Sequence, residues 1–127
     1  MRHERHYTLE EARAMLPWVV SRLAALRDAR ERLTDLETRQ ALVEGSSTNG
    51  GGEKGKQVGE AFVEFQNGLA DFDRHGIILR HLDTGLIDFP AIRDGQEIYL
   101  CWIDGEADIG FWHSLDAGFP GREPLED

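Results

Sequence analysis

Four side chains in the second half of the chain have the chemistry of a metal-binding or acid–base site. They are two aspartates, a glutamate and a histidine: Asp88, Glu106, His113 and Asp116. His113 and Asp116 are three residues apart, close enough to share a metal ion or a proton. Carboxylate and imidazole groups suit zinc, manganese and iron, so the residue types indicate a divalent transition metal. The spacing matches no established ligand motif such as HExxH, so residue type alone supports this site.

The same residues also have an ordinary structural interpretation. Asp88 would cap a turn, Glu106 would complete a hairpin at Asp104-Gly105, and His113 would be a hydrogen-bonded structural histidine. A functional site needs a pocket with perturbed titratable groups, and the sequence does not show one. Both interpretations therefore stay open at this point.

A second and weaker candidate metal site combines His75, His81 and Asp83 around a helix-to-strand junction. Histidines are favourable near the negative end of a helix dipole, which explains them without a metal. His3 and His6, near the start of the chain, could bind a metal adventitiously.

Cys101 is the only cysteine, which excludes an intramolecular disulfide and a four-cysteine zinc site. It would be a nucleophile only beside a base and with partial exposure, whereas a cysteine in mid-strand is more often a small buried hydrophobic residue. Arg122 could hold an anionic ligand. The simpler interpretation is that it neutralises a nearby carboxylate such as Asp116 or Glu123.

The first half of the chain predicts two helices. Thr8 and Glu11 form a capping-box pattern that begins the first helix. Pro17 predicts a short helix at about 9–15 followed by a break or kink, because proline removes an amide hydrogen and clashes with the preceding turn. Apolar residues continue at helical spacing, so we expect helix over 9–44 around that kink and a second helix over 57–75.

Residues 45–56 are rich in glycine and turn-forming residues and predict a flexible loop. The loop lacks the Gly and Lys-Ser/Thr spacing of a phosphate-binding loop, and no strand precedes it, which disfavours that function. Two helices joined by such a loop, each with one apolar stripe, form an antiparallel hairpin.

After Gly76 the apolar pattern changes to the alternation of strands. Asp94-Gly95 and Asp104-Gly105 are preferred centres of tight turns. Pro90 indicates the edge or the end of its strand. The sequence therefore predicts a three- or four-stranded antiparallel meander over 77–113, followed by a tail at 114–127, in one α+β domain spanning residues 1–127.

The strand at 97–103 is apolar on both faces. Ile98 and Trp102 lie on one face, and Tyr99 and Cys101 on the other, because strand residues alternate. The helices can cover only one face, so either the tail or a second copy of the chain must cover the other. Exposed apolar area of this kind usually marks an interface, and we expect a homodimer.

Charge and composition narrow the classes of partner. The formal net charge is −10, and residues 83–127 contain 11 acidic side chains against Arg93 and Arg122. Nucleic acid is therefore a disfavoured partner, because phosphate binding needs clustered Lys and Arg. No apolar run approaches the roughly 18 residues of a membrane span, and no secretory signal precedes the first helix. With a single cysteine, these features favour a cytoplasmic location.

Distinctive Gly, Asp and aromatic combinations fill the chain from residue 85 to 122. They are GLIDFPA at 85–91, DG at 94–95, YLCW at 99–102, GE at 105–106, FWH at 111–113, DAGF at 116–119 and GR at 121–122. With YTLEEA at 7–12 and LP at 16–17, they resemble a bacterial family catalogued as domain of unknown function 2203, over nearly the whole chain. The resemblance implies a shared fold in a bacterial cytosol and supplies no catalytic residues.

Two functions from different classes follow from these observations. The leading hypothesis is a non-enzymatic interaction or regulatory module with an unidentified protein partner, because no recognised catalytic motif is present and apolar surface is in excess. The alternative is a small metal-binding protein or metal-dependent enzyme that uses the carboxylate and histidine site. The sequence does not decide whether the protein is an enzyme.

Overall fold

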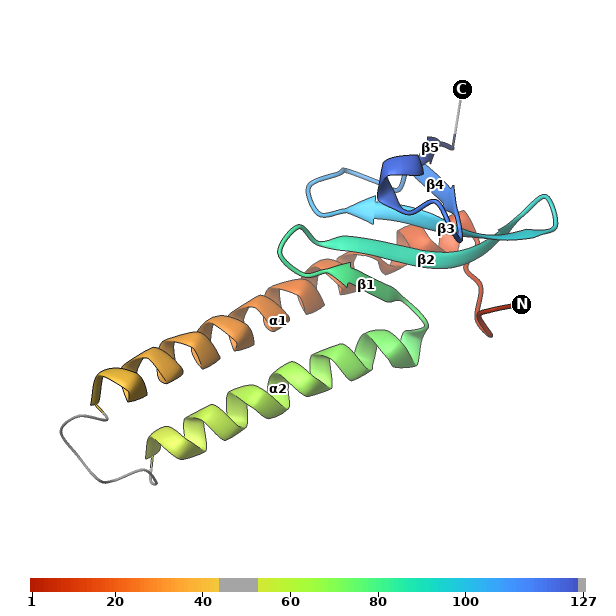
Figure 1. The fold of residues 1–127 in the computed structure, drawn as a ribbon. Helices are drawn as coiled ribbons and strands as arrows, with labels where there is room; N and C mark the ends of the chain where they lie inside the picture. The colour runs from red at the N-terminus through yellow and green to blue at the C-terminus, as the bar shows by residue number, and fades with distance from the viewer. Residues whose placement is uncertain (44–52, 126–127) are drawn as a thin grey trace.

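The computed structural model describes residues 1–43 and 53–125. These residues form two α-helices and a five-stranded antiparallel sheet, so the predicted α+β class is confirmed (Figure 1). The helices are α1 (Leu9–Val43) and α2 (Glu53–His75). The strands are β1 (Ile78–His81), β2 (Leu86–Arg93), β3 (Gln96–Ile103), β4 (Phe111–Ser114) and β5 (Glu123–Pro124), with a 3₁₀ helix, η1 (Phe119–Gly121), before the last. The sheet has more than the predicted three or four strands because part of the tail pairs with β4.

Helix α1 begins with the predicted capping box. The Thr8 amide donates to Glu11 Oε1 at 2.9 Å, and the Glu11 amide donates to Thr8 Oγ1 at 3.0 Å. The bonds from Thr8 lower the pKa of Glu11. The structure has no break at Pro17, because α1 continues through this residue, and the alternative of a kink stays a prediction. Buried residues on either side, Ala12 and Val19, anchor both segments in one core, and this packing outweighs the lost hydrogen bond.

The two helices form the predicted hairpin, and their far ends extend well beyond the sheet (Figure 1). Gly68 allows a close approach between them, since a Cβ at this position would lie 2.5 Å from Leu26 Cδ2. Helix α2 begins at Glu53, before the predicted residue 57, so the last part of the predicted loop is helical. Residues 45–52 of that loop, and residue 44 of the predicted first helix, lie outside the described residues. Neither described helix is long and apolar enough to cross a membrane.

Gly76 ends α2 as predicted, with φ at 67° and the next amide, Ile77 N, bonded to Phe72 O. The strands then follow one another as a meander in the order β1-β2-β3-β4-β5. Asp94 and Gly95 form the two-residue turn between β2 and β3, and both have positive φ, as such turns require. Asp104-Gly105 also forms a tight turn, closed by a bond from Glu106 N to Ile103 O at 3.0 Å. This turn does not make a two-residue hairpin, because it begins a longer connection from Ile103 to Phe111.

Pro90 lies in a part of β2 that has no partner in β1, because the pairing of these strands extends only as far as Asp88, opposite Ile78. The Pro90 carbonyl faces this free edge and accepts a hydrogen bond from Tyr7 N at 2.7 Å. The imide nitrogen faces the same edge, so no bond to β3 is lost. This placement agrees with the edge or end predicted for Pro90.

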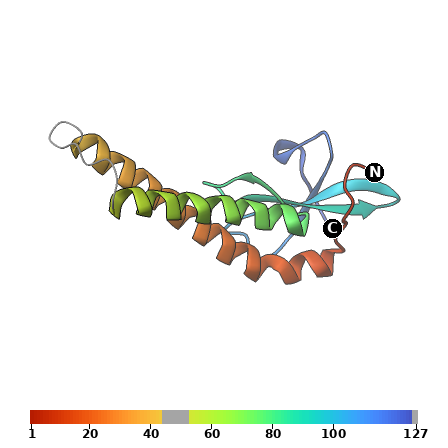
Figure 2. The same ribbon diagram turned by 90° about the horizontal axis from the view of Figure 1, so that it is seen from below.

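The sheet has two different faces. The face toward the helices is apolar and packs Phe89, Leu100 and Trp102 against Val19 and Leu23. Figure 2 shows the C-terminal segment around η1 on the opposite side of the sheet, which we call the outer face. Residues of the outer face, including Tyr99, are buried within a single chain. The outer face therefore no longer supports the expected homodimer, which stays a prediction.

Candidate functional site

The centre of the outer face contains a buried group of three possible metal ligands. Asp88, Cys101 and His113 come from the adjacent strands β2, β3 and β4, and at most 2% of each residue is exposed. Antiparallel register brings them together: Asp88 pairs with Cys101, and His113 pairs with Tyr99, two residues before Cys101. One carboxylate oxygen, one sulfur and one imidazole nitrogen lie within 4.8 Å of one another.

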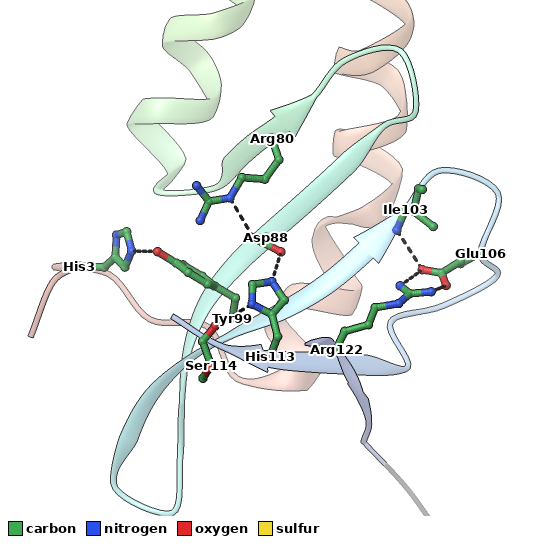
Figure 3. A network of polar contacts seen from close by, with 9 residues as sticks. All are labelled: His3, Arg80, Asp88, Tyr99, Ile103, Glu106, His113, Ser114 and Arg122. Atoms are coloured by element: carbon green, nitrogen blue, oxygen red, sulfur yellow. Dashed lines mark hydrogen bonds and ion pairs between the residues drawn. The ribbon is translucent and has the colours of Figure 1, made fainter. Parts of the chain in front are cut away.

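The backbone fixes the orientation of the His113 ring. Its Nδ1 lies 2.8 Å from the carbonyl oxygen of Ser114, so Nδ1 carries the hydrogen of this bond (Figure 3). Its Nε2 then faces Asp88 Oδ1 at 3.1 Å. Because Oδ1 of a carboxylate is also an acceptor, a cation, either a proton or a metal ion, is needed between Nε2 and Oδ1.

Arg80 of β1 occupies the other oxygen of Asp88. Its Nε donates to Oδ2 at 2.9 Å, and its guanidinium carbon lies 5.0 Å from the centre of the Tyr99 ring (Figure 3). Burial lowers the pKa of Arg80, but the bond to Asp88 outweighs this effect and the pKa is raised overall. Asp88 Oδ1 is thereby oriented toward His113, while Arg80, 42% of whose side chain is exposed, remains in contact with solvent.

The Cys101 thiol is protonated at neutral pH in the absence of a metal. Burial raises its pKa to about 12, the Asp88 charge adds to the rise, and Arg122 partly opposes it. A thiolate nucleophile is therefore disfavoured here, in agreement with the prediction of a buried hydrophobic residue. A bound metal ion would reverse this preference, because a coordinated thiol loses its proton.

A hollow of about 300 Å³ opens over the site. Asp88 and His113 lie in its lining with Arg80 and Asp116, and its apolar walls are Leu86 of β2 and, from the C-terminal segment, Leu115 and Phe119. The hollow lies at the small end of the range for ligand pockets. A ligand or a water molecule within it would reach the carboxylate and the imidazole directly.

The donor set is suitable for zinc or a similar transition metal. Ligands around a tetrahedral zinc ion lie about 3.3–3.7 Å apart, and the 3.1 Å between His113 Nε2 and Asp88 Oδ1 is close to that value. Metal-binding histidines typically donate their second nitrogen to a carbonyl or carboxylate, as His113 does to Ser114. Asp88 and His113 line the hollow, whereas Cys101 is fully buried behind them. Three protein ligands beside a hollow resemble a catalytic zinc site, which keeps one position open.

Glu106 and Asp116 do not join Asp88 and His113. Glu106 accepts bonds from the Ile103 amide at 2.9 Å and from both terminal nitrogens of Arg122, at 3.2 and 2.8 Å (Figure 3). Arg122 thus neutralises a carboxylate, although this is neither Asp116 nor Glu123. The Asp116 side chain lies at the rim of the hollow, is 96% exposed and has Arg2 4.0 Å away.

The three residues of the weaker candidate site have separate partners. The ring of His75 contacts Asp71 O and Trp18, and His81 bonds to Thr84 Oγ1 at 3.0 Å. Asp83 pairs with Arg30. Among residues 1–35 and 55–125, whose side chains the structure describes, the group of potential ligands close enough to hold a metal ion is Asp88, Cys101 and His113, and it includes none of these three.

The N-terminal segment lies against the outer face through Glu97. The amides of Arg2 and His3 and the ring of His6 all bond to this carboxylate, at 2.7 to 2.9 Å. Desolvation alone would raise the pKa of Glu97, but these bonds outweigh it and hold the pKa at about 2. The Nε2 atom of His3 also contacts Tyr99 Oη at 2.6 Å. The Nε2 atoms of His3 and His6 are therefore both occupied.

Cys101 is the site residue that sequence reasoning did not include. A signal for it was present, because a two-residue turn at Asp94-Gly95 fixes the register of β2 and β3. Counting outward from that turn pairs Arg93 with Gln96 and, five pairs later, Asp88 with Cys101. No such count reaches His113, because the connection before β4 is long and irregular.

Comparison with known proteins gives a family and no function. No curated protein and no solved structure matches the chain. A family model described as "Uncharacterized conserved protein (DUF2203)" matches residues 5–125. This match covers nearly the whole chain, in agreement with the resemblance noted above. The chain therefore belongs to the DUF2203 family.

Proposed function

We propose that this protein binds a divalent transition metal, with zinc the best fit, through Asp88, Cys101 and His113. The observation that carries the proposal is the contact between His113 Nε2 and Asp88 Oδ1 at 3.1 Å. Nδ1 already donates to Ser114 O, so Nε2 offers a lone pair to a carboxylate unless a cation lies between them. The buried sulfur of Cys101 supplies a third donor within 4.8 Å.

The open coordination position favours a ligand-binding or catalytic metal over a purely structural one. Structural zinc sites are closed by four protein ligands, whereas this site has three and borders a hollow of about 300 Å³. A metal there would act as a Lewis acid on a bound oxygen or would acidify a bound water. Asp88, Cys101 and His113 would hold the ion, and Arg80 would orient Asp88 through its bond to Oδ2.

Zinc titration against a chromophoric chelator tests the proposal. We expect one zinc ion per chain in the wild-type protein. His113→Gln and Cys101→Ser should each weaken binding by more than the roughly 10–100-fold that follows loss of an outer-shell partner. Thermal melting of each variant without metal would establish that it is folded.

Two matched controls separate ligands from nearby residues of the same type. His81→Gln removes a histidine bonded to Thr84, and Asp83→Asn removes an acid paired with Arg30. Both should leave zinc affinity unchanged. Wild-type protein that binds no zinc, or binding lost equally in the controls, would contradict the proposal.

A protein-interaction module is the second candidate, and exposed apolar residues on α2 favour it. Phe62 and Val63 of α2 are each 54% exposed. Residues of this kind can contact a partner helix. Light scattering at micromolar concentration tests the simplest form, the homodimer, and a monomer of 14.3 kDa at all concentrations would contradict it.

The setting of the protein is also proposed on sequence grounds. The family resemblance supports a bacterial origin, and a single cysteine supports a cytoplasmic location. The acidic C-terminal half argues against nucleic-acid partners. A buried thiolate ligand suits such a reducing compartment, because it would not be lost to oxidation.

A further inference from the structure

We infer that the metal site takes a small carboxylate-bearing organic molecule, which Arg80 recognises; this inference rests on the proposed metal site. Arg80 lies in the lining of the hollow together with Asp88 and His113. A ligand at the open coordination position would therefore lie between the metal ion and a guanidinium group.

The geometry of Arg80 leaves donors for such a ligand. Its Nε bonds to Asp88 Oδ2, and the terminal nitrogens extend toward Tyr99, with which the guanidinium also forms a hydrogen bond (Figure 3). The remaining N–H donors of the guanidinium are available to a ligand. Stacking at 5.0 Å over the Tyr99 ring restricts the plane of the guanidinium. A guanidinium in a fixed plane presents a fork of N–H donors, which matches the two oxygens of a carboxylate.

Charge favours an anion at this position despite the strongly acidic chain. A divalent ion and Arg80 would bring three positive charges, against two from the Asp88 carboxylate and a Cys101 thiolate. The remaining positive charge lies at the bottom of the hollow. Asp116 at the rim is balanced by Arg2, 4.0 Å away. An anion would therefore be attracted here, while the rest of the C-terminal half repels it.

The walls distinguish an organic acid from inorganic phosphate. Leu86, Leu115 and Phe119 line the hollow beside the polar group. An organic acid can place its carboxylate on the metal and Arg80 and its carbon skeleton against these side chains. Phosphate has no apolar part and would leave the walls in contact with water, so burial of apolar area favours the organic acid.

Cobalt(II) provides a direct readout, because its visible spectrum reports both the thiolate ligand and the number of ligands. Protein saturated with Co²⁺ would be titrated separately with benzoate, acetate and inorganic phosphate. We expect a change in the d–d bands with benzoate at lower concentration than with acetate, and the weakest response with phosphate. Arg80→Gln, measured at saturating Co²⁺, should raise the benzoate Kd by about tenfold or more, since a charge-assisted pair is lost.

Three further variants test the same inference if Arg80→Gln folds poorly. Arg80→Lys retains the charge without the fork and should give an intermediate Kd. Phe119→Ala, which alters a 39% exposed wall residue, should weaken benzoate and leave acetate unchanged. Arg93→Gln removes an arginine that lies over Trp112, away from the hollow, and should change neither ligand.

The outcomes separate this inference from the metal site itself. Absence of a thiolate-to-cobalt charge-transfer band would overturn both. A cobalt spectrum with the thiolate band but with d–d bands that none of the three anions changes would overturn only the ligand inference. Tighter binding of phosphate than of benzoate would overturn the organic acid, and equal benzoate affinity in Arg80→Gln would overturn the role of Arg80.

Discussion

The two faces of the sheet use the same strands for different purposes. On the helix face, Ile87, Phe89 and Leu100 pack in an apolar core. On the outer face, the alternate residues Asp88 and Cys101 belong to a buried polar group that also includes His113. The apolar face gains stability with each buried side chain, whereas a buried charged network contributes little net stability against an apolar replacement. A chain that needed only stability would gain little from the outer-face network, which is the reason for proposing a metal site there.

The helix face should show the largest loss of stability on truncation. Phe89 is fully buried there, so Phe89→Ala should lower the free energy of unfolding by about 3–5 kcal/mol. Urea denaturation followed by circular dichroism would measure this. Ile92→Ala is the matched control on the same strand, where 44% exposure predicts a loss below about 1 kcal/mol. Equal losses for the two variants would contradict the account of the helix face.

Removing one member of the outer-face network should lower the free energy of unfolding somewhat less than Phe89→Ala does. Asp88→Ala leaves His113 buried without its partner, and removal of one member of a buried ion pair costs about 3–5 kcal/mol. We expect about 3 kcal/mol, the low end, because Arg80 keeps solvent contact.

Replacing the whole network tests whether it exists for stability. The triple variant Arg80→Met, Asp88→Leu and His113→Leu should recover most of the stability lost in Asp88→Ala, because a packed apolar group has no desolvation penalty. It should bind no zinc. If the triple variant is no more stable than Asp88→Ala, the network contributes to folding stability, and its presence is no sign of a metal site.

Cys101→Ala should cost only about 1 kcal/mol, since one buried atom is removed from a site that can partly relax. The same variant should lose zinc, which would separate metal binding from stability. In the unmodified apo protein, the thiol should react slowly with iodoacetamide at pH 8, because its pKa is about 12. Rapid alkylation of the folded protein would contradict the burial of Cys101.

The smallest effect concerns Glu97, which holds the N-terminal segment on the outer face. Its pKa is depressed from 4.5 to about 2, so the folded state favours the charged form. The stabilisation is therefore fully present above about pH 4.5 and is lost as the pH falls toward 2. Wild-type protein should be more stable than Glu97→Gln above pH 4.5, and the difference should disappear near pH 2. A difference that does not change with pH would contradict this role for Glu97.

Much of the fold could be predicted from local patterns. The capping box at Thr8 and Glu11, the end of α2 at Gly76 and the turn at Asp94-Gly95 are set by neighbouring residues, and the structure has all three. The break at Pro17 was predicted wrongly because local propensity does not include tertiary packing. β5 was not predicted because two residues carry no periodic pattern.

The candidate site could be predicted only in part, and the reason is register. Asp88 and His113 were proposed from residue type and strand position, and they meet across β3. Glu106 turns back to Ile103 and Arg122, within a connection whose course no sequence pattern specifies. Counting strand pairs from the Asp94-Gly95 turn would have placed Cys101 opposite Asp88. Cys101 was instead considered alone, as a nucleophile, and not as a metal ligand.

X-ray absorption spectroscopy of the zinc-loaded protein tests the central claim most directly, because it identifies the atoms bound to the metal. The account predicts one sulfur at about 2.3 Å, with nitrogen and oxygen ligands at about 2.0–2.2 Å and an imidazole contribution. The sulfur signal should vanish in Cys101→Ser and persist in the control His81→Gln. A shell of nitrogen and oxygen alone in the wild-type protein would show that zinc binds elsewhere and would contradict the assignment of Asp88, Cys101 and His113.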